Sequence, residues 1–263
     1  MSEHQEKSDF FVGYLQAPAS ITKFYKLVIP LLIVLGAGFS FWISSAQKSA
    51  GEGVWDLSGE VEISGYLTVD PYPVIHIAGD QPRSVILVEQ TKMGATGSAI
   101  PYANQWVSVS GFAITRGDWT MLQLLPTSTF TVQPESAESA PQAVQMGEVV
   151  LTGEIIDSKC FLGVMKPGSG KVHRACAAMC LRGGIPPMLV VTNEQGDKYG
   201  FMLMNDNGES VSIELADHVA VPITLSGRME QRGDITYIRY NEENVTRLAG
   251  SALTAYGETL AYN

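Results

Sequence analysis

The feature that most constrains this chain is an uncharged, largely apolar run near its N-terminus, residues 27–47. A helix of about 20 apolar residues is long enough to cross the hydrocarbon core of a bilayer. Lys23 and Lys26 lie directly before the run, and only Lys48 follows it closely. Because positive charge collects on the cytoplasmic side, we expect a cytoplasmic N-terminus and an exported C-terminal body.

A cleaved signal peptide is the alternative interpretation of this run, because Ser44-Ser45-Ala46 resembles a small-residue cleavage site. The leader over residues 1–26 argues against cleavage, since a signal peptide begins with a short basic stretch. We therefore predict a cytoplasmic leader over residues 1–26 and an uncleaved transmembrane anchor over residues 27–47. The predicted location is the bacterial inner membrane, with a single pass and with the body in the periplasm.

The composition of the whole chain limits its partners. The 263 residues are 45% hydrophobic and 17% charged, which is typical of a folded protein rather than a disordered one. The formal net charge is −10 and the isoelectric point is about 4.8, whereas nucleic-acid binding requires a basic surface. We expect the membrane and a protein of an inner-membrane complex as partners, and no nucleic acid.

After Gly53, short apolar stretches alternate with Gly, Pro, Asp and Asn, a pattern that is typical of strands and turns. A segment rich in Pro, Ala, Ser and Glu divides this pattern and has the composition of a linker. We predict a mainly β body with a first unit over residues 54–132, a linker over 133–147, a second unit over 148–250 and a C-terminal tail over 251–263. Residues 210–215 (SVSIEL) are among the expected strands.

The two units share a repeated hairpin. Residues 107–124 and 223–240 each contain Ser-Gly, four further residues and then Arg-Gly-Asp-x-Thr. Gly-Asp suits a tight hairpin turn that needs a positive φ, so the motif predicts a turn and not an adhesion site. The repeat, the many short strands and the glycines at expected bends predict two tandem OB-like β-barrels. An immunoglobulin-like sandwich is the main alternative.

Every cysteine of the chain lies in one segment, Asp157–Gly184, with one of the four histidines. The part of this segment that follows a Pro-Gly break is Ala-rich and ends at Gly-Gly, so it predicts a short helix inserted in the second unit. On this helix His173, Cys176 and Cys180 have the spacing i, i+3, i+7 and share one face. Cys160, at the end of the preceding strand, is able to lie opposite that face.

Three interpretations of these side chains stay open at this point. The candidate ligand set of a tetrahedral Cys3His metal site, for zinc or copper or for a haem held elsewhere, is Cys160, His173, Cys176 and Cys180. A structural disulfide from Cys160 to Cys176 or Cys180, with no cofactor, is the simpler alternative, because exported thiols meet an oxidising compartment. Such a bridge leaves one cysteine over. Thiol–disulfide exchange is the third interpretation.

The motif Gly-Glu-Ile-x-Asp-Ser-Lys-Cys, followed by His-x-x-Cys-x-x-x-Cys and Gly-Gly-x-Pro-Pro-x-x-Val-Val, lies within residues 148–250. This segment resembles a group of uncharacterised bacterial exported or membrane-anchored OB-like domains. The resemblance implies a barrel fold and an envelope location, and it implies no activity.

A catalytic role is not expected, because no Ser-His-Asp arrangement, nucleophile elbow or paired-carboxylate motif can be drawn from the sequence. We therefore predict a non-catalytic accessory or docking subunit of a membrane complex. A metal- or haem-handling protein and a thiol–disulfide redox partner are the two alternatives.

Overall fold

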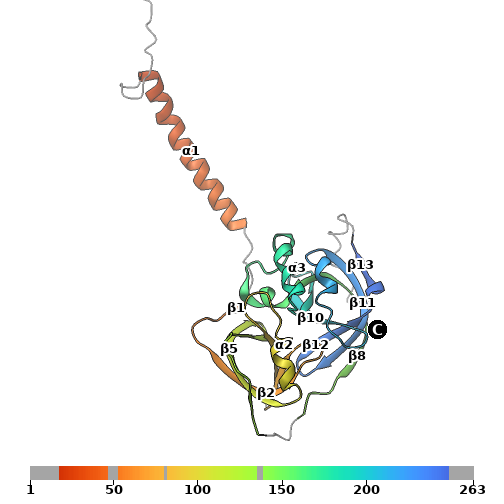
Figure 1. Cartoon of the computed structure of the whole chain (residues 1–263). Helices are drawn as coiled ribbons and strands as arrows, with labels where there is room; N and C mark the ends of the chain where they lie inside the picture. The colour runs from red at the N-terminus through yellow and green to blue at the C-terminus, as the bar shows by residue number, and fades with distance from the viewer. Residues whose placement is uncertain (1–17, 47–52, 80–81, 135–138, 249–263) are drawn as a thin grey trace, which may run out of the picture. The chain divides into compact units, whose positions relative to one another are not determined.

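The computed structural model describes residues 18–46, 53–79, 82–134 and 139–248 (Figure 1). The predicted tail and most of the predicted leader lie outside the described residues. The chain divides into two compact units, residues 1–50 and residues 51–263, and each is described by itself.

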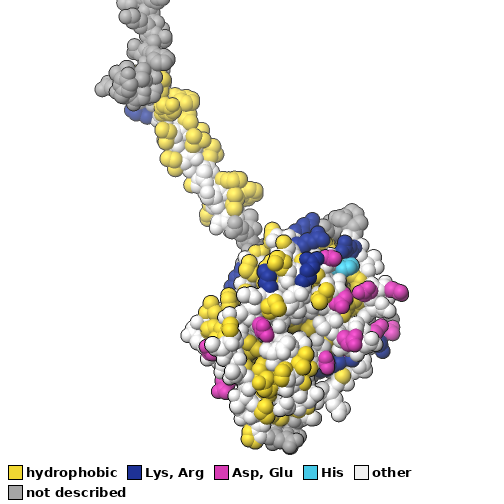
Figure 2. Space-filling view, viewed as in Figure 1, with side chains coloured by type: hydrophobic (Ala, Val, Ile, Leu, Met, Phe, Trp, Pro, Cys, Tyr) yellow, Lys and Arg dark blue, Asp and Glu magenta, His cyan; other side chains and the backbone are white. Residues whose placement is uncertain are grey.

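The first unit contains the helix α1 (Ala19–Ala46), with Pro30 inside it. The segment Ala19–Ser45 is long and apolar enough to cross a membrane, with a mean hydropathy of 2.2. Apolar side chains cover its described length (Figure 2). The predicted apolar helix is therefore confirmed. It begins ahead of the predicted anchor, at Ala19, because the carbonyl of Pro18 already accepts the N–H of Thr22 and starts the helical hydrogen bonding.

The first β sheet contains a closed five-stranded barrel. Its strands are β2 (Val61–Thr68), β3 (Val74–Ile77), β4 (Arg83–Val88), β5 (Trp106–Arg116) and β6 (Trp119–Leu124). Strand β2 pairs with β3 and β5, β3 pairs with β4, and β4 pairs in parallel with β6. The pairing of β6 with β5 closes the ring. Two short strands, β1 (Val54–Trp55) and β7 (Thr131–Val132), add to β5.

Alternating apolar side chains of these strands fill the barrel, as the two-residue period of a strand requires. The buried aliphatic residues include Leu67, Ile75, Leu87, Val107 and Leu122. A short helix, α2 (Thr96–Ala99), and the 3-10 turn η1 (Ile100–Tyr102) connect β4 to β5. The interior of the barrel is thus a packed core.

The second sheet has six strands in the order β12-β10-β9-β8-β11-β13. They are β8 (Val144–Asp157), β9 (Pro187–Thr192), β10 (Lys198–Asn205), β11 (Pro222–Arg232), β12 (Ile235–Tyr240) and β13 (Val245–Arg247). Strand β10 pairs in parallel with β12, and β11 pairs with β8, β12 and β13. Strand β8 begins at Val144, inside the predicted linker.

Five helical segments belong to the second part of the body. Those between β8 and β9 are the π-type turn η2 (Cys160–Val164), the 3-10 turn η3 (Lys171–His173) and α3 (Arg174–Arg182). The 3-10 turn η4 (Glu214–Asp217) connects β10 to β11, and η5 (Glu242–Asn244) precedes β13.

Both repeated hairpins are present. Strands β5 and β6 join through Gly117-Asp118, and β11 and β12 join through Gly233-Asp234. Gly117 has a φ of +54° and Gly233 a φ of +62°. The prediction that the Arg-Gly-Asp motifs form turns is therefore confirmed.

One predicted strand, residues 210–215, is wrong, because the backbone there turns into η4. The N–H of Val211 donates to Tyr72 Oη at 3.1 Å instead of entering a strand ladder. Val211 and Leu215 are buried whereas Ile213 is exposed. The alternating apolar residues that suggested a strand thus lie at a helical turn, where two of them are buried and Ile213 faces outward.

The two sheets share one apolar core. It joins side chains of the first sheet, among them Tyr72 and Met121, to side chains of the second, among them Met188 and Met202. Tyr72 Oη donates to the carbonyl of Leu203 at 2.8 Å, which places a hydrogen bond across this core. The two sheets therefore belong to the same compact unit.

Candidate metal centre

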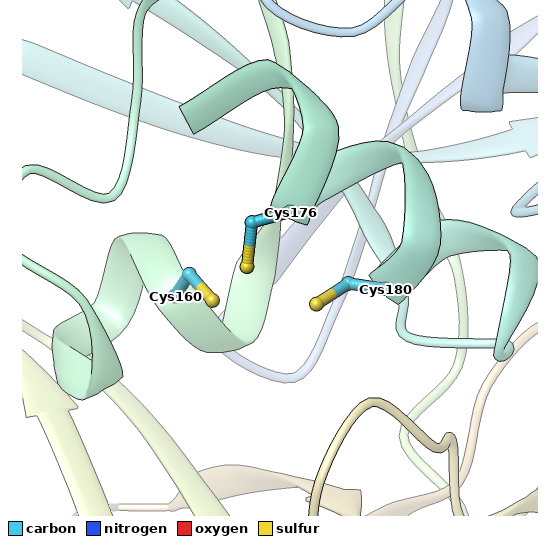
Figure 3. A group of neighbouring side chains, drawn as sticks. All are labelled: Cys160, Cys176 and Cys180. Atoms are coloured by element: carbon cyan, nitrogen blue, oxygen red, sulfur yellow. The ribbon is translucent and has the colours of Figure 1, made fainter. Parts of the chain in front are cut away.

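The three cysteine sulfurs point toward one another (Figure 3). Their Sγ atoms lie within 4.8 Å of each other, with Cys160 on η2 and with Cys176 and Cys180 on α3. Cys160 and Cys180 are buried, and Cys176 is half-buried. By geometry, this three-sulfur group can hold a metal ion.

All three cysteines are free thiols, so the expected bridge from Cys160 to Cys176 or Cys180 is not formed. No pair of these sulfurs lies more than 4.8 Å apart, so the third atom is not remote from the other two. A zinc–sulfur bond is about 2.3 Å long, which places the sulfurs around one ion about 3.8 Å apart. Only small shifts of the side chains are needed to enclose an ion.

The helix α3 places two of the sulfurs on one face, because residues four apart lie one turn above each other. The helix ends where the N–H of Gly183 donates to the carbonyl of Met179 at 3.0 Å. Gly184 follows with a φ of +87°, a conformation that glycine adopts without steric cost. The Gly-Gly pair thus ends the helix within one turn after the second of its cysteines.

Asp157 fixes the turn that carries the remaining cysteine. Its carboxylate is fully buried, and Oδ1 accepts the N–H of Cys160 at 2.8 Å, as a capping residue does. Its other oxygen, Oδ2, lies 2.8 Å from Nε2 of His173, which is also buried. Asp157 therefore joins the backbone of Cys160 to the ring of His173.

The structure places His173 beside Asp157 and not in the three-sulfur group. His173, Asp157 and Cys160 form a second group whose ligand atoms lie within 4.8 Å of one another. Cys160 belongs to both groups. The physical reason is that His173 ends the 3-10 turn η3, which has about three residues per turn, and α3 begins only at Arg174. The expected common face of one continuous helix is therefore interrupted.

Lys92, which the sequence analysis did not identify, reaches the sulfurs from the first sheet. Its Nζ donates to Cys176 Sγ at 2.7 Å and to Cys180 Sγ at 3.6 Å. The hydrogen bond to Cys176 raises the pKa of Lys92 above its usual value. An ammonium group thus faces two of the three sulfurs.

Lys159, next to Cys160 in the sequence, is also part of the site. Its side chain is buried, and Nζ donates to the carbonyls of Glu89 at 2.7 Å and Thr91 at 2.9 Å. Burial lowers the pKa of Lys159 to about 8. The two carbonyls replace water around an ammonium that would otherwise be costly to bury.

The two buried thiols have opposite pKa shifts. Their mutual hydrogen bond raises the pKa of Cys160, and burial adds to this effect. The same hydrogen bond lowers the pKa of Cys180, and the positive charge of Lys92 also acts to lower it. The ammonium of Lys92 therefore favours the thiolate form of Cys180, which it faces at 3.6 Å.

Arg116 of the first repeated hairpin holds η2 in place. Its guanidinium donates to the carbonyl of Phe161 at 2.6 Å and lies 4.0 Å from the centre of the Phe161 ring. A guanidinium over an aromatic face is attracted by the ring quadrupole. The barrel of the first sheet thus positions the turn that contains Cys160.

No simple sequence signal marks Lys92, because it lies far from the cysteines along the chain and only the contact between the two sheets brings it to them. Lys159 does lie inside the quoted Asp-Ser-Lys-Cys motif, but a lysine beside a cysteine does not by itself indicate a buried ammonium.

A scan of the chain against protein-family models and a search of curated proteins gave no match. The resemblance to exported OB-like domains therefore stays a prediction.

Proposed function

We propose that this protein binds one soft metal ion through Cys160, Cys176 and Cys180. The observation that carries the proposal is the convergence of three unbridged sulfurs within 4.8 Å of one another. Thiolates are the ligands that zinc and copper(I) accept most readily in proteins. Asp157 supports the site by fixing Cys160, in the way that partners outside the ligand set orient the ligands of known metal sites.

We further propose that α1 is a single-pass anchor with a cytoplasmic N-terminus and that the body lies in the periplasm. The length and hydropathy of α1 support the anchor, and Lys23 and Lys26 before the apolar run support the orientation. In this arrangement the protein binds metal outside the cytoplasm.

We also infer that both sheets are OB-like barrels. The order β2-β3-β4-β6-β5, with its parallel pair between β4 and β6, agrees with that reading of the first sheet. The pairings β8-β9-β10-β12-β11 follow the same order, with a parallel pair between β10 and β12. Helix α3 follows the first of these strands, whereas α2 follows the third strand of its own sheet. This position supports the proposal that α3 is an insertion particular to the second sheet.

The test uses the full chain, purified in detergent without oxygen and supplied with zinc or with copper(I). We expect one bound ion per chain and three thiols that react with a thiol reagent only after a chelator is added. Replacing Cys160, Cys176 or Cys180 by Ser lowers bound metal to background, because each removes a ligand. His218→Ala is the matched control, since it removes a histidine outside both groups.

Three freely reactive thiols in the presence of either metal would contradict the proposal. So would metal binding that survives each of the three serine substitutions, because the ion would then lie elsewhere.

Thiol–disulfide exchange is the second candidate, and the half-exposed position of Cys176 beside two buried thiols favours it. Native protein that contains a bridge between Cys176 and either neighbour, reducible by mild dithiol while the fold persists, would support this candidate over metal binding. Mass spectrometry of the alkylated protein identifies the bridge. An accessory role in a membrane complex is compatible with both chemistries and stays part of the proposal.

A further inference from the structure

A turn of the first sheet is built into the cysteine group. Residues 89–94 follow β4, and Thr91 in this turn has a φ of +58°, which few non-glycine residues adopt. The ammonium of Lys159 binds the carbonyls of Glu89 and Thr91. The last residue of the turn donates its N–H to the carbonyl of Gly183 at 2.8 Å. The segment between β8 and β9 therefore holds this turn at two places.

The held turn gives the charge of Lys92 a defined place. Between those two anchoring points, Lys92 extends to Cys176 at 2.7 Å and to Cys180 at 3.6 Å. A lysine on a freely moving loop would lose considerable side-chain entropy to make such contacts. Here the anchoring of the turn has already removed much of its backbone freedom.

The ligand set itself favours an ion that needs only three sulfurs. In the described part of the chain, the group formed around Cys176 and Cys180 contains Cys160 and no histidine or carboxylate. His173 is engaged by Asp157. Structural zinc sites almost always have four protein ligands. Copper(I) is stable with three thiolates, and soft sulfur ligands select it.

Charge acts in the same direction. Three thiolates around copper(I) carry a net charge of −2, and three thiolates around zinc carry −1. At equal distance, the ammonium of Lys92 therefore attracts the copper(I) complex twice as strongly. The Asp157 carboxylate acts in the opposite sense, but it is engaged by His173 and by the N–H of Cys160, and the ammonium of Lys159 adds a second positive charge.

Two exposed methionines are neighbours in the sequence of Lys92 and Cys180. Met93 follows Lys92 and is 50% exposed, and Met179 precedes Cys180 on α3 and is 58% exposed. Thioether sulfur is a soft ligand that suits copper(I) better than zinc. Both methionines are accessible for a first contact with an arriving ion.

From these observations we infer that the ion is copper(I) and that Lys92 is a specificity-determining residue that favours it over zinc. This inference rests on the proposed three-cysteine site.

The experiment compares Lys92→Gln with Lys92→Arg in the full chain in detergent, without oxygen. Gln removes the charge and keeps a hydrogen-bond donor, whereas Arg keeps the charge. Lys171→Gln is the matched control, because Lys171 is an exposed lysine of η3 for which the described contacts include no cysteine sulfur. Affinity for copper(I) is measured by competition with bicinchoninate, and affinity for zinc by competition with a chromogenic zinc chelator.

We expect the unaltered protein to hold copper(I) more tightly than zinc. Lys92→Gln should weaken copper(I) binding about tenfold and zinc binding about threefold, since the lost attraction is half as large for the zinc complex. The Arg variant and the Lys171 control should stay within about twofold of the unaltered protein. X-ray absorption at the copper edge should show sulfur neighbours and no nitrogen neighbour.

If Lys92→Gln lowers the affinities for copper(I) and zinc by the same factor, or lowers neither, the proposed role of Lys92 is overturned. Preference for zinc in the unaltered protein, with a fourth ligand, would overturn the copper(I) assignment and leave the three-cysteine site standing. Binding of neither ion would overturn the site itself.

Circular dichroism of the metal-free variants shows whether each one folds. If Lys92→Gln does not fold, the role of Lys92 is tested by measuring both affinities in Lys92→Leu. The copper(I) assignment is then tested by the X-ray absorption spectrum of the unaltered protein.

Discussion

Asp157 and His173 show how single residues prepare the sulfur group. The carboxylate of Asp157 is fully buried, yet both of its oxygens have partners, the N–H of Cys160 and the ring of His173. A buried carboxylate without such partners would be strongly unfavourable. The pair therefore supports the position of Cys160 without lying in the three-sulfur group.

His76 provides a second residue-scale test, far from the cysteines in the sequence. Its ring lies between Thr68 Oγ1, at 3.0 Å from Nε2, and Ser84 Oγ, at 3.1 Å from Nδ1. Burial lowers the pKa of His76 to about 4. Because the folded protein keeps this ring neutral, its contribution to stability is complete above about pH 6.5, the unfolded pKa, and is lost as the pH falls toward 4.

We therefore predict that the free energy of unfolding falls by up to roughly 3 kcal/mol from this residue between pH 6.5 and 4, at about 1.36 kcal/mol per pKa unit. His76→Gln, which cannot be protonated, should lose correspondingly less over the same interval. Urea unfolding at several pH values measures both proteins. Parallel pH profiles for the two proteins would show that His76 does not titrate as described.

At the scale of elements, the contact between the turn over residues 89–94 and the end of α3 decides the site. Gly183 lies so close to the carbonyl of Lys92 that a Cβ at this position would collide with it. Only a residue without a side chain allows the turn to approach the helix end. Gly183, which ends α3, thus also leaves the space that the backbone of Lys92 occupies beside the sulfurs.

Gly183→Ala should therefore destabilise the protein by about 1–3 kcal/mol, as overpacking usually does. It should also weaken metal binding, because the collision displaces the turn that carries Lys92. Gly97→Ala in α2 is the matched control, since no atom lies within 4 Å of its added Cβ. That control should be neutral or slightly stabilising by helix propensity. Thermal unfolding measures the stability of both variants, and metal titration measures their affinity. If Gly183→Ala and Gly97→Ala have the same stability and the same affinity, the proposed contact is contradicted.

At the scale of the whole molecule, the body is held together by the core that its two sheets share. Tyr72 lies in this core, fully buried, and its hydroxyl joins the carbonyl of Leu203 to the N–H of Val211. Lys92, Lys159 and Arg116 add polar contacts across the same junction. Separation of the sheets would break all of these contacts together.

We therefore predict that residues 51–263 unfold in one cooperative transition. Tyr72→Phe should lower the free energy of unfolding by about 1–3 kcal/mol, because it leaves two buried main-chain groups without their partner. Tyr199→Phe is the control at an exposed tyrosine and should change little. Calorimetry and circular dichroism provide the measurement. Two separate transitions, with only one of them affected by Tyr72→Phe, would show that the sheets fold independently.

Local patterns predicted much of the element content of this protein. The apolar run, the alternating stretches and the two Gly-Asp turns each depend on residues close together in the chain, so hydropathy and turn chemistry were sufficient to find them. Residues 210–215 are the exception. Their alternation suits a strand, and the partner that replaces the strand ladder, Tyr72, lies far away in the sequence.

For the candidate site, the sequence by itself determined that Cys160, Cys176 and Cys180 lie in one short segment, two of them one helical turn apart. Only the tertiary structure decided that all three sulfurs meet, that His173 binds Asp157 instead, and that Lys92 joins them. The reason is physical. Helical spacing is set by neighbouring residues, whereas the meeting of η2, α3 and the turn over residues 89–94 is set by the packing of one sheet against the other, which no local pattern encodes.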